Sequence, residues 1–343
     1  MGYTIATLRA LSALGVDLHV VHWDHKKLTP FVLPTVSGLT FYPRSQMSLK
    51  DMRNLALELE PTLTVVSGWN DRDYLSVSRA LRRMSRRVVL ALDGQWNGTP
   101  RQHVAKFLGK IKWFNRYYSN AWVAGTYQHE YASMLGFSRR DIVGDLYSAD
   151  LSLFHKTQEQ SHASKGASYP HRFLFVGRFE PIKGLDTLLS AWKTLAECTR
   201  DWELHLIGDG SLKNELRSAP GVIVKDFMQP DRLMDEAASS GCFVLPSRGE
   251  PWGVVVHEFA ATGMPLIVSD VVGSASTFLI SGLNGFSFKV DDAQDLANRM
   301  RKIIDSTDRE LLAMAEISHR LSHRITPLTS AANLLSIIYG DGQ

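Results

Sequence analysis

Short apolar runs alternate with helical patterns through the second half of the chain. The runs predict strands over Phe173–Arg178, Glu203–Gly208, Val222–Phe227, Cys242–Ser247, Leu266–Asp270 and Gly285–Val290. Apolar residues at helical spacing lie between them, as in Leu185–Ala196 and Val254–Thr262. Because continuous apolar strands separated by helices are typical of a parallel sheet covered on both faces, we predict a doubly wound α/β domain over residues 171–325.

The first half repeats this alternation less regularly, and we predict a second Rossmann-like domain over residues 1–155. A doubly wound domain opens with a strand and a glycine-rich turn, whereas this chain opens with a helical pattern at Tyr3–Leu14. We expect that a first strand was lost through truncation or a misplaced start. The alternative is a domain that lacks this strand.

Two segments lie outside the predicted domains. Residues 156–170 are rich in Ser, Gln, His and Lys and predict an exposed linker. Residues 326–343 predict a C-terminal helix that could pack back on the N-terminal domain. The predicted fold class is therefore α/β, with two doubly wound Rossmann-like domains facing each other across a cleft.

Composition favours a folded protein. The 343 residues are 44% hydrophobic and 21% charged, which argues against disorder. No apolar run reaches the length of about 18 residues that a membrane span needs, and the N-terminus lacks a signal-peptide pattern. With only two cysteines, we expect no disulfide framework and a cytoplasmic protein.

Charge is distributed unevenly. Residues 1–150 hold 19 Lys and Arg against 12 Asp and Glu, and the remainder holds 19 against 23, which gives +7 and −4 within a net charge of +3. Residues 106–118 mix cations with aromatic side chains, and such a helix could lie on an anionic membrane face. The alternative is a packing helix with a solvated basic side. No nucleic-acid recognition motif accompanies the charge, so we expect no nucleic-acid partner.

The strongest candidate site lies between Pro246 and Glu258, where Pro-Ser-Arg-Gly-Glu-Pro-Trp-Gly leads from a predicted strand into a helix. Backbone N–H groups at Gly253 and Val254 would lie at the helix start, where a diphosphate is a natural occupant. Glu250 and Glu258 add two carboxylates, and one beyond the phosphates can accept from ribose hydroxyls. The alternative is a capped surface helix with two incidental acids.

Two more loops join this site. Gly177 and Arg178 open a second loop that ends at Lys183, and its two cations could neutralise a leaving diphosphate in place of a divalent metal. The alternative is an exposed basic loop. Gly208 and Gly210 in a third loop permit close approach of the backbone. All three loops leave the carboxyl ends of predicted parallel strands, where ligands collect.

These motifs resemble those of glycosyltransferase family 4, whose members are retaining enzymes of the two-Rossmann (GT-B) kind. Glu-x7-Glu stands here as Glu250 and Glu258, and Gly-Arg-x5-Gly begins at Gly177. The resemblance is dense over residues 173–290. Two departures bear on donor contacts: His257 stands where many relatives have Asn, and Thr277 where an acid is common.

The resemblance also implies roles for the matching residues. Glu258 would bind ribose, Glu250 would approach the donor sugar, and Arg178 and Lys183 would hold the diphosphate. The remaining donor-binding candidates are Phe227 and Met228 beside the base, and Gly177, Gly208, Gly210, Gly253 and Val254 along the phosphates and sugar.

The N-terminal half resembles the family's acceptor domain more faintly. Relatives often place a histidine near the reacting sugar, after the strand that corresponds to Val88–Asp93. No histidine follows here until His103, so Asp93 or Gln95 is expected in that place. We take Asp93 as the catalytic candidate of this half.

We therefore expect a retaining, metal-independent glycosyltransferase that moves a hexose from a UDP-, GDP- or ADP-sugar to a saccharide or lipid-linked acceptor, in polysaccharide, glycolipid or other glycoside biosynthesis. It would work in the cytoplasm or peripherally on the inner membrane face, without a cofactor. His19, His22 and His25 do not have the spacing of a usual metal site, so we predict no metal. The alternatives are a donor-binding but non-catalytic partner subunit and a nucleotide-sugar epimerase.

Overall fold

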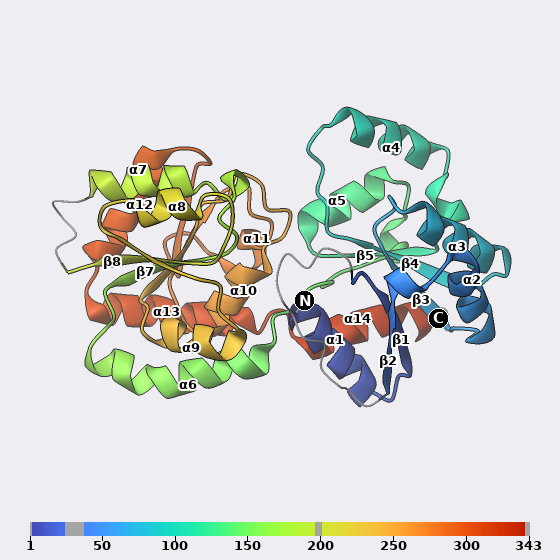
Figure 1. Cartoon of the computed structure of the whole chain (residues 1–343), viewed down its shortest axis with the longest axis horizontal. Helices are drawn as coiled ribbons and strands as arrows, with labels where there is room; N and C mark the ends of the chain where they lie inside the picture. Colours follow the sequence, from blue (N-terminus) through green and yellow to red (C-terminus); the bar gives the residue numbers. More distant parts are fainter. Residues whose placement is uncertain (1, 25–37, 196–200, 340–343) are drawn as a thin grey trace. The chain divides into compact units, whose positions relative to one another are not determined.

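The chain forms two compact α/β units in the computed structural model, which describes residues 2–24, 38–195 and 201–339 (Figure 1). Unit 1 comprises Met1–Ser148 and Pro327–Gln343, and unit 2 comprises Ala149–Thr326. The chain thus crosses between the units twice, after Ser148 and after Thr326. Both units contain parallel sheets with helices around them, so the predicted α/β class is confirmed.

Unit 2 is built on one six-stranded parallel sheet. Its strands are β7 (Arg172–Val176), β8 (Glu203–Ile207), β9 (Val222–Lys225), β10 (Cys242–Leu245), β11 (Leu266–Ser269) and β12 (Gly285–Phe288). They lie in the order β12-β11-β10-β7-β8-β9, which is the strand order of a Rossmann fold. The order reverses between β7 and β10, and the crevice at such a reversal is where ligands bind in this fold class.

Helices cover both faces of this sheet. They are α6 (Leu151–Ala167), α7 (Leu185–Thr194), α8 (Lys213–Arg217), α9 (Pro230–Ala238), α10 (Val254–Ala261), α11 (Ala275–Phe278), α12 (Ala293–Ile304) and α13 (Asp308–Ser322). In Figure 1, α7, α8 and α12 lie on one side of the sheet, and α6, α9 and α13 lie on the other. Every residue of β10 and β11 is buried, as expected for central strands covered on both faces.

Unit 1 holds two separate parallel sheets among its described residues. One pairs β1 (Leu18–His22) with β2 (Leu39–Pro43), and the other has the order β3-β4-β5-β6. The latter strands are Leu63–Ser67, Arg87–Leu92, Asn120–Val123 and Ile142–Val143. A doubly wound sheet would place one further strand between β1 and β3. Among the described residues no strand joins the two sheets.

The helices of unit 1 come from both ends of the chain. They are α1 (Gly2–Ala13), α2 (Leu49–Glu58), α3 (Arg72–Arg83), α4 (Pro100–Lys110), α5 (Thr126–Met134) and α14 (Pro327–Tyr339). The α14 helix packs against α1, where Thr7 Oγ1 lies 3.4 Å from Ser330 Oγ. Asn333 of α14 also donates to the Asp145 carboxylate at 2.9 Å.

The prediction of an exposed linker over residues 156–170 is wrong for most of its length. Residues Leu151–Ala167 form α6, which belongs to unit 2. Its buried residues recur at helical spacing: Leu151, Phe154, Thr157, Ser161 and Lys165. The last three of these are polar. A composition-based prediction missed this face because Thr, Ser and Lys are residues that usually lie at the surface.

Candidate functional site

Two motif-bearing loops meet at the point where the strand order of unit 2 reverses. One follows β7 and ends at Gly184, and the other follows β10 and begins at Pro246. Gly184 has a φ of 65°, and a Cβ there would overlap the Pro246 carbonyl oxygen. The backbone N–H of Arg248 donates to the Ile182 carbonyl at 2.8 Å. Glycine at position 184 thus lets the loops pack directly against each other.

The two loops also share a charged pair. The ammonium of Lys183 donates to a carboxylate oxygen of Glu250. Their side chains are only 14% and 17% exposed, so both charges have lost most of their water. Charges in such surroundings are costly unless paired, and the pair holds a cation and an acid side by side at the reversal point.

Arg248 is a site residue that the sequence analysis missed. It donates to the Pro181 carbonyl at 2.9 Å, to Asp186 at 2.7 Å and to Asp291 at 2.5 Å. Hydrogen bonding to Asp186 raises the pKa of the Arg248 guanidinium above its ordinary value. Arg248 therefore fastens the β10 loop to the β7 loop, to α7 and to the segment after β12. The sequence alone does not distinguish a loop arginine that bonds to other elements from one that is only exposed to solvent.

The start of α10 has no side-chain cap. Gly253 is its N-cap with a φ of 86°. A Cβ at Gly253 would lie 2.8 Å from Glu250 Cγ, so glycine is needed for this turn. The first N–H groups of a helix lack intrahelical partners, and those that follow Gly253, beginning with Val254, lie next to the Lys183–Glu250 pair.

Glu258 lies one turn into α10, four residues after Val254 and on the same helix face. It is half-buried, and burial raises the pKa of its carboxyl to about 7. This carboxyl therefore titrates near neutrality, which is typical of functional sites. Neighbouring His257 points elsewhere. It is buried, and its ring nitrogens lie 3.1 Å from the Ala149 backbone N–H and 2.8 Å from the Ser322 carbonyl.

The glycines of the β7 and β8 loops bring these two backbones together. A Cβ at Gly208 would overlap the Gly177 carbonyl oxygen, and a Cβ at Gly210 would lie 2.5 Å from the Phe179 carbonyl oxygen. Arg178 lies between these contacts with its side chain exposed, and it forms no ion pair with any residue that the structure describes. Its guanidinium is thus available to an anion.

The remaining candidates lie farther from the reversal point or in the other unit. Phe227, with 42% of its surface exposed, and Met228 follow β9, at the outer edge of the sheet. Asp93 belongs to unit 1, where it follows β4 and accepts from the Tyr147 hydroxyl at 3.3 Å. The structure therefore brings together Lys183, Glu250 and the start of α10, with Arg178 on the adjoining β7 loop.

The sequence around this site is similar to that of known proteins. Residues 170–306 match the model of the family "Glycosyl transferases group 1". This segment contains every candidate residue of unit 2. Residues 170–306 are thus similar to the group 1 glycosyltransferases. An uncharacterised glycosyltransferase of Methanocaldococcus jannaschii is 32% identical over 144 residues, which cover 39% of this chain and 38% of that protein.

Solved structures extend the likeness to both units of the glycosyltransferase fold. Sucrose-phosphate synthase of Thermosynechococcus elongatus matches with a TM-score of 0.70 and 19% identity, over 98% of this chain and 91% of that chain. Anabaena HepE, solved in complex with UDP, matches with a TM-score of 0.67 and 18% identity, over 85% and 82%. The chain thus has the GT-B fold.

The matches to glycosyltransferases cover only part of those proteins. The chain spans about a third to two fifths of the length of the curated relatives it matches. Within the part of the chain that the structure describes, no helix has the length and apolar character of a membrane span.

Proposed function

We propose that the chain transfers a sugar from a nucleotide-diphosphate sugar to an acceptor hydroxyl, with retention of anomeric configuration. The observation that carries this proposal is the junction of the β7 and β10 loops. It joins the Lys183–Glu250 pair to an uncapped helix start, and the adjoining Arg178 has no ion-pair partner among the described residues. A diphosphate needs cations and N–H donors at one place, and this junction supplies both.

The donor would lie across the carboxyl ends of the strands. Its phosphates bind the N–H groups after Gly253, and its ribose hydroxyls bind the carboxylate of Glu258. The base lies toward Phe227 and Met228. Anabaena HepE, which has the same fold, was solved with UDP, and this makes UDP the first nucleotide to test.

Donor binding would rearrange the charged pair. In the donor-free protein Lys183 and Glu250 neutralise each other. A bound diphosphate offers Lys183 a stronger anionic partner, so Lys183 moves to the phosphates and leaves Glu250 to accept from the sugar hydroxyls. When the bond from the anomeric carbon to the phosphate oxygen breaks, its electron pair stays on the diphosphate. The acceptor oxygen bonds to the anomeric carbon on the same face, and the acceptor proton passes to the departing phosphate oxygen. Arg178 and Lys183 stabilise that developing charge without a metal.

The acceptor would be taken by unit 1. Asp93 is exposed at the carboxyl end of β4, where it can accept a hydrogen bond from a substrate hydroxyl. A hollow of about 400 Å³ opens nearby at the start of α5, and its lining includes Thr126, His129, Arg139 and Asp145. Its lining is mostly apolar, and Thr126, His129 and Arg139 would supply the polar contacts to a saccharide or a phosphorylated acceptor.

The test is donor turnover with UDP-, GDP- and ADP-sugars, saccharide and lipid-linked acceptors, and excess chelator. We expect release of one nucleoside diphosphate together with a glycoside whose anomeric proton signals show retention. An isomerised sugar formed without acceptor would identify an epimerase instead. Nucleotide binding without turnover on any acceptor would identify a non-catalytic partner subunit.

A further inference from the structure

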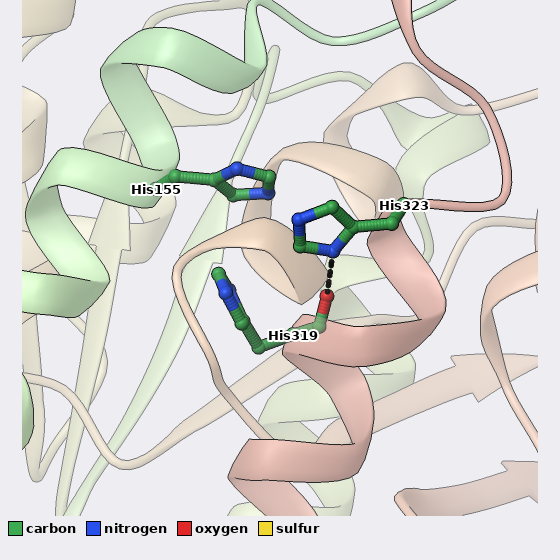
Figure 2. A group of neighbouring side chains, drawn as sticks. All are labelled: His155, His319 and His323. Carbon is green, nitrogen blue, oxygen red and sulfur yellow. Dashed lines mark hydrogen bonds between the residues drawn. The ribbon is translucent and has the colours of Figure 1, made fainter.

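Three histidines gather in unit 2 on helices that are far apart in the sequence. His155 lies on α6, whereas His319 and His323 lie one turn apart at the end of α13 (Figure 2). The centroid of the His155 ring lies 4.6 Å from that of His319 and 4.3 Å from that of His323. One ring nitrogen from each histidine can be chosen so that all three lie within 4.8 Å of one another.

Hydrogen bonds fix the tautomers of the two α13 rings. His319 Nδ1 lies 2.9 Å from the Ala261 carbonyl oxygen, and His323 Nδ1 lies 3.1 Å from the His319 carbonyl oxygen. A carbonyl can only accept, so each Nδ1 carries a proton, and in the neutral ring Nε2 is the nitrogen with the free lone pair. A carbonyl that holds one ring nitrogen while the other faces outward is the usual arrangement of a metal-binding histidine.

The third ring, that of His155, has a hydrogen-bond partner of its own. Its Nε2 lies 3.1 Å from Ser322 Oγ, which itself donates to the His319 carbonyl at 2.6 Å. Three imidazoles at one point are a ligand set that suits zinc.

We propose that His155, His319 and His323 bind one Zn²⁺ ion. In a tetrahedral site with Zn–N bonds of about 2.1 Å, ligand nitrogens lie about 3.4 Å apart, so the rings must approach slightly. His323 is exposed and can do so by rotating its side chain, and water completes the coordination. The site is separate from the Lys183–Glu250 pair and does not act on the diphosphate.

The position of the cluster indicates what the ion would do. His155 follows Ala149 by six residues, and His323 precedes Thr326 by three. These are the two ends of unit 2, next to both chain crossings between the units. Zinc would therefore fasten the start of α6 to the end of α13 and stiffen both connecting segments from the side of unit 2.

The test uses the full chain without a histidine tag, stripped of metal by chelator and then titrated with Zn²⁺. We expect one equivalent to bind, and Co²⁺ to give the visible absorption of a tetrahedral site. His323→Ala should weaken Zn²⁺ binding more than about tenfold, and His319→Ala should do the same. The matched control is His162→Ala, which removes an exposed histidine of α6 outside the cluster and should bind as the wild type does.

A second readout separates a site from chance contact. Zn²⁺ should raise the Tm of the wild type and slow hydrogen exchange in residues 149–155 and 319–326, and neither effect should occur in His323→Ala. Because His323 is exposed, this variant should fold even if His319→Ala does not. Equal binding by the wild type and His323→Ala, or no binding by the wild type, would overturn the proposal.

Discussion

Arg178 differs from the other cations near the reversal point because its guanidinium has no ion-pair partner among the described residues. Lys183 is paired with Glu250, and Arg248 is held by two carboxylates. A cation held by the fold stabilises the fold, whereas an unpaired one is available to substrate. Arg178 is therefore the residue at which loss of function and loss of stability should separate most clearly.

We expect Arg178→Ala to lower kcat/KM by about 10²- to 10³-fold, because a donor aimed at the developing diphosphate charge is lost. The Tm should stay unchanged. Steady-state kinetics and thermal unfolding of the same preparations measure both. The matched control is Arg232→Ala, which removes an exposed arginine on α9 and should leave the rate intact. A rate within threefold of the wild type would contradict the role of Arg178.

For Glu258, in contrast to Arg178, we expect a substitution to change the stability of the fold. The pKa of the Glu258 carboxyl is about 7 in the folded protein, above the ordinary value of 4.5, so the folded state binds the proton more tightly. Below pH 4.5 the carboxyl is protonated in both states and does not lower the free energy of unfolding. As the pH rises from 4.5 to 7, the free energy of unfolding decreases. Glu258→Gln should be more stable than the wild type at pH 8, by up to about 3 kcal/mol, and equal to it near pH 4.5. Urea unfolding at both pH values tests this, and equal stability at pH 8 would count against it.

At the scale of elements, the strands of unit 2 could be predicted because each is a continuous apolar run. The glycines and acids of the two motif loops could also be predicted, since they fall where strands end. The helix α6 could not, because Thr157, Ser161 and Lys165 occupy its buried face. The cluster of His155, His319 and His323 could not either, because only tertiary packing brings α6 and α13 together.

Other sequence expectations had different outcomes. His19 lies 2.9 Å from the Tyr42 hydroxyl and packs on that ring, and His25 lies outside the described residues. Arg248 was overlooked because its role depends on Asp186 and Asp291, which lie on other elements. The assignments of Glu250, Lys183 and Asp93 to steps of the reaction stay predictions.

Arg248 provides a test of the loop junction. Arg248→Ala removes bonds to Asp186, Asp291 and the Pro181 carbonyl. We expect a loss of about 1–3 kcal/mol in the free energy of unfolding and weaker nucleotide binding, because the β7 and β10 loops separate. Urea titration measures the first effect and calorimetry the second. The control Arg217→Ala breaks only an exposed pair with Asp226 and should lower the free energy of unfolding by less than about 1 kcal/mol. Equal losses in the two variants would contradict the claim that Arg248 holds the two loops together.

At the scale of the whole molecule, unit 1 carries an exposed apolar face that we expect to bind an anionic membrane. On α4 and just after it, Val104, Phe107 and Ile111 are 60%, 63% and 55% exposed. They recur at helical spacing, so they share one face, and Lys110 and Lys112 are exposed beside them. Exposed apolar residues flanked by lysines are typical of helices that lie in a membrane interface.

We expect the protein to sediment with vesicles that contain anionic lipid and to stay in solution with zwitterionic ones. Replacing Val104, Phe107 and Ile111 together by Ser should abolish this binding. The control Ile223→Ser changes an exposed apolar residue of β9 and should not. Equal binding of the wild type to both kinds of vesicle would contradict the dependence on anionic lipid. Equal binding of the triple variant and the wild type would contradict the role of this helix face.

The central claim is that the carboxyl edge of the unit 2 sheet binds a nucleoside diphosphate, and thermal-shift titration tests it most directly. UDP, GDP and ADP are titrated against the wild type, Glu258→Ala and the control Arg232→Ala. We predict that one diphosphate raises the Tm of the wild type and of the control by several degrees at about a hundredfold excess over Kd, and that Glu258→Ala loses this rise. A wild type that none of the three stabilises, or an equal shift in Glu258→Ala, would contradict the account.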